Sequence, residues 1–225
     1  MFVRVAIHSV LDEVGSDAAI VQQRVAFAGR AVCGDGLPLA GGAEEKLGLR
    51  GSDTARLSFV EMRVPADRLL GKEGDGFKVL MQVLNGSRLG IAAQAIGITR
   101  RALDESVAYA KSRKQFGVPL AQHQMIQFYI AEMATRLDAA RLLTLKAAAD
   151  EDRGELRPEL ASMAKIVASD LAEWATIKAV QIHGGNGYLR DYVVERLMRD
   201  ARITKIYEGT NEIQRLIIGR ALTRA

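Results

Sequence analysis

Apolar residues recur at helical spacing through most of the second half of the chain. Four segments carry this pattern, residues 88–113, 122–150, 158–182 and 210–222. Within each segment the apolar side chains fall on one face of a 3.6-residue repeat. The third stripe, for example, consists of Leu160, Met163, Ala164, Val167, Leu171 and Trp174. Because antiparallel packing would bury all four stripes, the pattern predicts a mainly α fold with a C-terminal four-helix, up-down bundle.

The pattern changes before residue 75. Apolar residues in 55–64 alternate with polar ones and then switch phase after Phe59, which predicts a strand with a bulge that ends at Pro65. Residues 71–76 hold glycines and are expected to form a loop into the bundle. We therefore expect two domains, a partial β-domain over residues 1–74 and the helical bundle over residues 75–225.

The first forty residues give a weaker pattern. Val3, Val5 and Ile7 alternate as in a strand, residues 20–27 fit either a strand or a short helix, and residues 34–42 are loop-like. A fragment of two strands is not stable alone, so it must pack on the bundle or pair with another chain.

Composition is that of an ordinary globular protein, with 48% hydrophobic and 26% charged residues in 225. No apolar run reaches the length of a membrane span, and Asp12 and Glu13 interrupt the N-terminus before a signal-peptide core could form. Cys33 is the single cysteine, which fits a reducing compartment. We expect a cytoplasmic protein, or one of the mitochondrial matrix if the source is eukaryotic.

The net charge of +4 does not indicate a nucleic-acid or membrane partner. Lysine and arginine alternate with acidic residues along most of the chain, as in residues 196–202. This mixture favours solvated helix faces with local anion sites over a continuous basic patch. A phosphate-bearing cofactor or a CoA ester would use such sites equally well, and no metal site is expected.

Three short strings stand in order along the helical part: Arg-Lys-Gln-Phe-Gly at 113–117, Gln-Ile-His-Gly-Gly-Asn-Gly-Tyr at 181–188, and Ile-Tyr-Glu-Gly-Thr at 206–210. Together they resemble the C-terminal part of the acyl-CoA dehydrogenase family, and the resemblance extends from about residue 44 to residue 225. It implies the bundle of that family, FAD as cofactor, and α,β-dehydrogenation of an acyl-CoA thioester in fatty acid or amino acid catabolism. The family passes its electrons to an electron-transferring flavoprotein.

Glu208 is the candidate catalytic base. Removing the weakly acidic α-proton needs a carboxylate in an apolar setting, which Ile206 and Tyr207 would provide. Gly209 lets the backbone approach a ligand, and Thr210 could cap the following helix. The simpler alternative is that Glu208 only stabilises the start of a helix electrostatically.

The resemblance favours the catalytic alternative. Relatives with the Tyr-Glu-Gly string use its glutamate as base. Others, including isovaleryl and long-chain types, carry the base directly before the arginine of the first bundle helix. This chain has Ser87 there, which cannot act as a carboxylate base. The contrast favours Glu208 and a short- or medium-chain-like substrate.

The resemblance also implies binding residues. Arg113 corresponds to the arginine that pairs with the FAD pyrophosphate, and Phe116 to a residue that touches the FAD of a neighbouring subunit. The full set implied for FAD is Arg113, Gln115, Phe116, His123, Gln124, Gln181, Ile182, His183, Gly184, Gly185, Thr210 and Glu212. The set implied for the CoA substrate is Asn85, Ser87, Arg88, Tyr207 and Gly209.

These assignments have simpler alternatives. Arg113 could be a solvated cation at a helix end, His123 an ordinary core or surface histidine, and Gly184 a helix C-cap. Two positions depart mildly from the family: Asn85 stands where many relatives have Asp, and Val193 where Pro is common.

A larger departure lies before the bundle. The family has an N-terminal helical domain and a full β-domain, with an aromatic-Ile-Thr string that contacts the flavin. No such string precedes Lys46, so we expect a partial product that binds FAD weakly and has little activity alone. We also expect a homo-oligomer formed through residues 122–222. The alternatives are a non-catalytic helical dimerisation or partner subunit, and a flavin oxidase or monooxygenase on the same fold.

Overall fold

The computed structural model describes residues 44–52, 54 and 66–224, together with four two-residue strands at 6–7, 25–26, 39–40 and 57–58. The chain divides into two compact units, residues 1–83 and 84–225, and each is described by itself. The border between the two units, after residue 83, lies inside the long helix that begins at Gly76. The expected domain boundary at residue 75 remains a proposal.

The first unit contains two antiparallel strand pairs. β1 (Ala6–Ile7) pairs with β2 (Val25–Ala26), and β3 (Leu39–Ala40) pairs with β4 (Leu57–Ser58). β1 and β4 lie inside segments expected to form strands. β2 lies in residues 20–27, for which a strand or a short helix was expected, and it is a strand. The prediction of a loop over residues 34–42 is wrong for Leu39 and Ala40, which form β3. Their backbone groups pair with β4, a partner distant in sequence that local composition does not reveal. The other residues of these predicted elements, including the bulge, lie outside the described residues.

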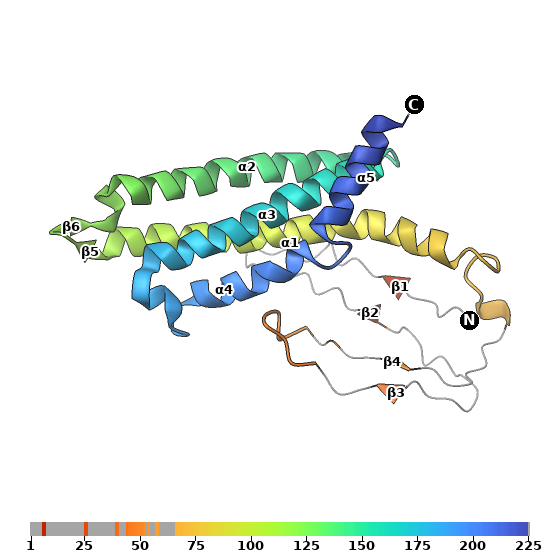
Figure 1. The fold of residues 1–225 in the computed structure, drawn as a ribbon, viewed down its shortest axis with the longest axis horizontal. Helices are drawn as coiled ribbons and strands as arrows, with labels where there is room; N and C mark the ends of the chain where they lie inside the picture. The colour runs from red at the N-terminus through yellow and green to blue at the C-terminus, as the bar shows by residue number, and fades with distance from the viewer. Residues whose placement is uncertain are drawn as a thin grey trace. The chain divides into compact units, whose positions relative to one another are not determined.

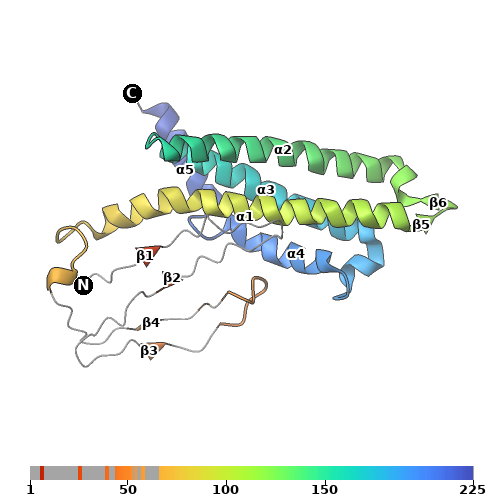
Figure 2. The ribbon, with the colours of Figure 1, turned by 180° about the vertical axis from the view of Figure 1, so that it is seen from behind.

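The second unit is the predicted helical bundle. Its main helices are α1 (Gly76–Ser112), which begins in the first unit, α2 (Gln124–Asp152), α3 (Pro158–His183), α4 (Val193–Arg202) and α5 (Asn211–Thr223). A hairpin of β5 (Lys114–Gln115) and β6 (Val118–Pro119) joins α1 to α2. Within the bundle, α1, α2 and α3 run alongside one another, and α5 crosses α3 at the end away from this hairpin (Figures 1 and 2). The mainly α fold is therefore confirmed.

Two helix expectations need correction. α1 begins at Gly76, ahead of the predicted start at 88, and α4 was not expected at all. α4 is short and rich in charge, and its buried side is limited to Val194, Leu197, Asp200 and Ala201. Its apolar residues do fall at helical spacing, but the helix has only ten residues, so the stripe spans fewer turns than in the predicted helices. The four predicted helices are otherwise present.

Small residues dominate the bundle core. Alanines at 0% exposure line α1, α2 and α3, and they pack with larger side chains such as Met133 and Leu137. Short side chains at helix contacts allow the axes to approach closely. The buried hydroxyls among them, for example Thr99 and Ser106, donate to the carbonyl four residues earlier, at 2.8 and 2.7 Å. These hydroxyls are thus satisfied within their own helices and do not interrupt the packing. Of the helices that the structure describes, none is long and apolar enough to cross a bilayer.

Candidate active site

Residues 206–210, here called the Glu208 turn, connect the short helix η4 (Ile203–Lys205) to α5. Glu208 has φ +55° and Gly209 has φ +88°, so two consecutive residues adopt left-handed backbone conformations. This conformation costs a non-glycine residue about 1–2 kcal/mol. Such residues persist where the surroundings fix them, and they cluster at functional sites. The strained residue here is the one predicted to act as base.

Three helices hold the Glu208 turn through its carbonyl groups. Gln214 of α5 donates its side-chain amide to the carbonyls of Glu208 and Gly209, at 3.1 and 2.9 Å. Lys165 of α3 donates to the Gly209 carbonyl at 2.9 Å, and Arg88 of α1 to the Glu208 carbonyl at 3.4 Å. The turn is therefore tied to α1, α3 and α5 at the same time.

The Glu208 side chain lies against the first third of α1. The Ser87 hydroxyl donates to Glu208 Oε2 at 2.5 Å, although the two residues are 121 positions apart. The two positions at which the resemblance places a base, 87 and 208, are thus neighbours in space. Ser87 orients one carboxylate oxygen, and Glu208 itself is half-buried.

Arg88 places a buried cation next to this carboxylate. Its side chain is 4% exposed and donates to Asn85 Oδ1 at 2.7 Å. Burial lowers the pKa of Arg88, and the charge of Glu208 opposes that shift. Asn85 therefore still pairs with Arg88, although it lacks the charge of an aspartate.

Tyr207 precedes Glu208 in the turn and is anchored to α1. Its hydroxyl donates to Oε1 of Gln94 on that helix. Burial raises the pKa of Tyr207, and the nearby charge of Glu208 raises it further. The phenol is consequently neutral and fixed at neutral pH. Sequence reasoning assigned no role to Gln94.

A buried polar cluster lies beneath the Glu208 turn, and sequence reasoning missed it. Lys165 donates to Asn211 Oδ1 at 2.8 Å, Asn211 Nδ2 donates to Ser169 Oγ at 2.9 Å, and Ser162 Oγ donates to Gln214 Oε1 at 2.8 Å. All five side chains are at most 1% exposed. The sequence held one signal for this cluster: Lys165 falls at the same helical spacing as the buried alanines of α3, so a buried lysine could have been expected.

Several of the residues implied for FAD lie elsewhere in the bundle, at or next to the β5–β6 hairpin. Arg113, Gln115 and Phe116 are exposed there, and Phe116 is 93% exposed with φ +52°. His123, just before α2, lies edge-on to Phe116 with ring centroids 6.0 Å apart, and its Nε2 is 3.3 Å from the Gln115 carbonyl oxygen. Gln124 begins α2 and is exposed. These residues form one surface cluster, here called the hairpin cluster.

The turn after α3 is anchored by aromatic contacts. His183 is 4% exposed, donates Nδ1–H to the Ala179 carbonyl at 2.8 Å, and stacks on Tyr109 of α1 at 4.2 Å between centroids. Burial lowers the pKa of His183. Asn186 donates to the hydroxyls of Tyr109 and Tyr192, at 2.9 and 3.1 Å. The side chains of Ile182 and His183 thus face the protein, whereas Gln181, Gly184 and Gly185 lie nearer its surface.

The glycines of this turn serve different purposes. A Cβ on Gly187 would lie 2.6 Å from the Val180 carbonyl oxygen, so the fold itself requires glycine there. Gly184 has φ +58°, as expected for the residue that ends a helix. A Cβ on Gly185 would have no neighbour within 4 Å. Packing among the described residues therefore does not explain Gly185, and these residues leave the space beside it open.

The predicted site residues thus form two groups. Asn85, Ser87 and Arg88 come together with the Glu208 turn, and Thr210 and Glu212 follow at the start of α5. Glu212 is exposed, and its own backbone N–H and then the Thr210 hydroxyl lower its pKa. The hairpin cluster and the turn after α3 lie at the far end of α1. From Arg88 to Ser112 the helix axis advances roughly 36 Å, at 1.5 Å per residue.

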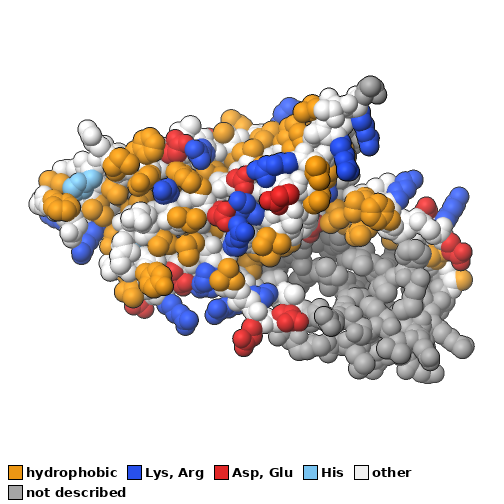
Figure 3. Space-filling view, in the orientation of Figure 1, with side chains coloured by type: hydrophobic (Ala, Val, Ile, Leu, Met, Phe, Trp, Pro, Cys, Tyr) orange, Lys and Arg blue, Asp and Glu red, His pale blue; other side chains and the backbone are white. Residues whose placement is uncertain are grey.

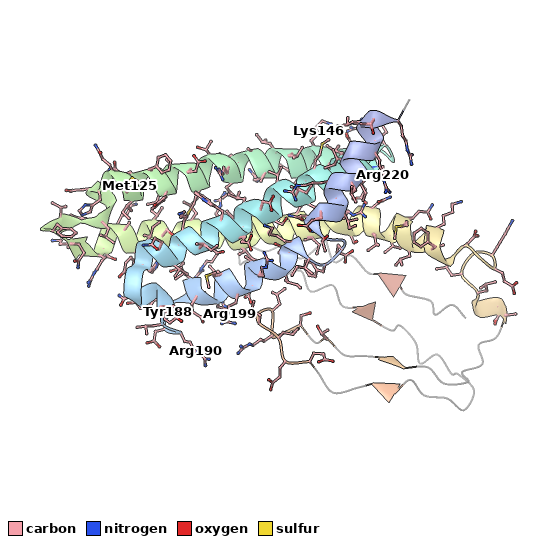
Figure 4. All side chains as sticks on the ribbon, viewed as in Figure 1. Met125, Lys146, Tyr188, Arg190, Arg199 and Arg220 are labelled. Atoms are coloured by element: carbon pink, nitrogen blue, oxygen red, sulfur yellow. The ribbon has the colours of Figure 1, made fainter. Side chains whose placement is uncertain are left out.

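Three labelled residues lie toward this end of the bundle. Tyr188 and Arg190 lie on the segment between α3 and α4, and Met125 lies at the start of α2 (Figure 4). Tyr188 is 85% exposed.

Comparison with known proteins identifies the family to which this bundle belongs. Residues 74–223 match the family described as acyl-CoA dehydrogenase, C-terminal domain. An acyl-CoA dehydrogenase of Bacillus subtilis (strain 168) is 57% identical over 182 residues, which cover 81% of this chain and 48% of that protein. The acryloyl-CoA reductase (NADH) of Anaerotignum propionicum is 52% identical over 184 residues, covering 82% and 47%.

Solved structures agree. The butyryl-CoA dehydrogenase of Megasphaera elsdenii superposes with a TM-score of 0.82 at 49% identity, covering 83% of this chain and 49% of that one. A structure from work on the electron transferring flavoprotein of Acidaminococcus fermentans gives the same TM-score and identity, covering 84% and 50%. The chain belongs to the acyl-CoA dehydrogenase family and carries its C-terminal domain. It spans about half the length of the relatives it matches.

Proposed function

We propose that the protein serves the FAD-dependent α,β-dehydrogenation of a short-chain acyl-CoA thioester, with Glu208 as the base that removes the α-proton. The observation that carries this proposal is the Glu208 turn, a strained carboxylate position held by three helices and oriented by Ser87 at 2.5 Å. A short acyl chain is supported by the relatives named butyryl-CoA dehydrogenase and short-chain-specific acyl-CoA dehydrogenase.

The protein's own residues perform the proton step. The α C–H bond breaks and the proton passes to a Glu208 oxygen, while the electron pair becomes the new C=C bond. FAD, when bound, would accept the hydride that leaves the β-carbon. Ser87 and the neutral Tyr207 fix the position of Glu208, and the Arg88 cation next to it suits an anionic ligand. In the opposite direction, which the name of the Anaerotignum relative suggests, protonated Glu208 would return the proton to the α-carbon.

We infer that the hairpin cluster and the turn after α3 contact the FAD of a neighbouring subunit. Their residues fit such a role, because Arg113 is exposed for a phosphate, Phe116 for stacking, and Gly185 leaves space for main-chain contact. The hairpin cluster and Glu208 of the same chain lie at positions roughly 36 Å apart along α1. One FAD molecule is too short to contact both. Thr210 and Glu212, beside Glu208, would meet the second cofactor.

A homo-oligomer follows from this arrangement. Large apolar side chains are exposed on α2, α3 and α5, namely Met125, Phe128, Leu142, Leu145, Val167, Ile177, Ile213 and Leu216. Apolar groups spread over the helices in Figure 3, where they alternate with charged ones. Burying such residues is the usual driving force for association. We propose a dimer or tetramer, with an electron-transferring flavoprotein as the electron acceptor.

The function is tested by mixing the chain with excess FAD and butyryl-CoA under nitrogen and recording flavin absorbance. We expect the oxidised flavin band to bleach slowly as crotonyl-CoA forms. The acyl chain supplies the two electrons, but a chain that spans about half the length of its relatives should bind FAD weakly. A protein that binds no flavin would instead support a scaffold subunit. Rapid reoxidation of the reduced flavin by oxygen would support an oxidase or monooxygenase.

Gly185→Ala tests the FAD assignment separately from catalysis. We expect FAD affinity to fall about tenfold or more, because the new methyl group occupies the space left for the cofactor, while the melting temperature stays unchanged. Gly187→Ala is the contrasting variant, since its Cβ meets backbone atoms and should lower the melting temperature. FAD affinity is measured by flavin fluorescence. Unchanged affinity in Gly185→Ala would contradict the assignment.

A further inference from the structure

Lys165 is a fully buried cation directly beneath the proposed base. Its side chain is 0% exposed, and its ammonium donates to the Gly209 carbonyl at 2.9 Å and to Asn211 Oδ1 at 2.8 Å. Both acceptors are neutral oxygens. One belongs to the residue that follows Glu208, and the other to the first residue of α5. Lys165 therefore joins α3 both to the Glu208 turn and to the helix that follows it.

Burying this charge is costly, so its position calls for an explanation beyond packing. An ammonium in a dry environment loses hydration that two neutral acceptors restore only in part. An ordinary apolar side chain would fill the same space in α3, where the buried neighbours one turn away are small residues, Ala161, Ser162, Ala168 and Ser169. What the ammonium supplies is charge-assisted hydrogen bonding, which is stronger and shorter than that of neutral donors. One of its two acceptors is the Gly209 carbonyl, next to the strained residue.

We propose that Lys165 is a positioning residue for the reaction, whose ammonium holds the Gly209 carbonyl and thereby keeps Glu208 in the left-handed conformation that directs its carboxylate to Ser87. This role rests on the proposed function of Glu208 as base. Gln214 supports the same carbonyl with a neutral amide, so Lys165 contributes the charged part of the support. Neither side chain touches the reacting atoms.

The role has a pH signature. Burial, and after it the charge of Arg88 on α1, lower the pKa of Lys165 to about 8, although Asp170 of α3, Glu212 of α5 and Glu208 act to raise it. Because the folded pKa lies below 10.5, the ammonium loses its proton as pH rises through about 8. The charged support of the turn is then lost. The rate of the proton step should therefore fall on the alkaline side of pH 8, and only when residue 165 is lysine.

The proton step is measured alone by deuterium exchange. The 225-residue chain with excess FAD is incubated with butyryl-CoA in D₂O, and deuterium entering the α-carbon is followed by NMR across the pH range that brackets the Lys165 pKa of about 8. Lys165→Met removes the donor, Lys165→Gln keeps a neutral donor, and Lys178→Met makes the same change elsewhere on α3, where the lysine lies over the Tyr129 ring. Hydrogen–deuterium exchange of the backbone amides of residues 206–211 reports on the turn itself.

We expect Lys165→Met to lower the maximal exchange rate about 10- to 100-fold, since small misplacements of a reacting group cost up to about 10² in rate. The KM for butyryl-CoA should stay nearly unchanged, the amides of the turn should exchange about tenfold faster or more, and the alkaline decline should vanish. Lys165→Gln should lose less rate, and its alkaline decline should vanish as well. Lys178→Met should match wild type in every measurement.

The possible failures are distinguishable. Wild-type protein without α-carbon exchange overturns the proposed function, and the turn amides then still report whether Lys165 holds the turn. Wild-type exchange that Lys165→Met leaves unchanged overturns the positioning role alone. That role is also overturned if the turn amides of Lys165→Met are as protected as those of wild type, or if the alkaline decline persists without the lysine.

Discussion

Glu208→Gln is expected to slow the reduction of flavin by butyryl-CoA by about 10²–10⁴-fold, the usual contribution of a positioned acid or base. The substitution keeps the size of the side chain, and its amide oxygen can still accept the Ser87 hydroxyl. Fold and ligand binding should therefore survive while the proton acceptor is lost. Stopped-flow absorbance of the flavin gives the rate.

Glu132→Gln is the matched control, because it makes the same chemical change at a glutamate paired with Arg136 on α2. It should reduce flavin at the wild-type rate. If Glu208→Gln does so too, Glu208 is not the base.

A second variant uses the contact between positions 87 and 208. In Ser87→Glu combined with Glu208→Gln, a carboxylate returns to the same region from α1 instead of from the turn. Since Ser87 Oγ and Glu208 Oε2 are 2.5 Å apart, we expect part of the lost rate to return.

Gly209→Ala is expected to have the second largest effect, a loss of about 10²-fold in the rate of flavin reduction. The new Cβ would lie 2.6 Å from Gln214 Nε2, and an alanine at φ +88° is strained in any case. The Gln214 amide must move, and it supports the carbonyls of both Glu208 and Gly209. Stability should fall by about 1–2 kcal/mol from the backbone strain alone, measured by urea unfolding.

Gly219→Ala separates this local effect from a general effect of added methyl groups. Gly219 lies inside α5, and a Cβ there would meet no atom within 4 Å. Alanine should stabilise this helix by about 0.5–1 kcal/mol and leave the rate unchanged. A Gly209→Ala variant that behaves like Gly219→Ala would contradict the claim that the turn is held in one strained conformation.

The long helices could be predicted from sequence because their stripes are regular and end near Gly117, Gly154 and Pro158. α4 was missed because it is only ten residues long, although its apolar residues fall at helical spacing. β3 was also missed, because strand pairing depends on a distant partner and not on local pattern. Periodicity reports burial along one element and says little about contacts between elements.

The candidate site shows the same limit. The string at 206–210 singled out Glu208, yet nothing in it reveals the left-handed backbone or the Ser87 contact across 121 residues. Lys165 was overlooked because a lysine is usually a solvated helix position. The family resemblance implied which residues bind FAD and the CoA substrate. The structure shows that these residues lie in two groups, one at each end of α1. That division is what leads us to propose that a neighbouring subunit completes the cofactor site.

The central claim is that Glu208 exchanges a proton with the α-carbon of the thioester, and deuterium incorporation measures this event without requiring hydride transfer to complete. Wild-type protein, FAD and butyryl-CoA in D₂O should give deuterium at the α-carbon, and Glu208→Gln should give at least about 10²-fold less. α-Carbon exchange at the wild-type rate in Glu208→Gln would contradict the claim.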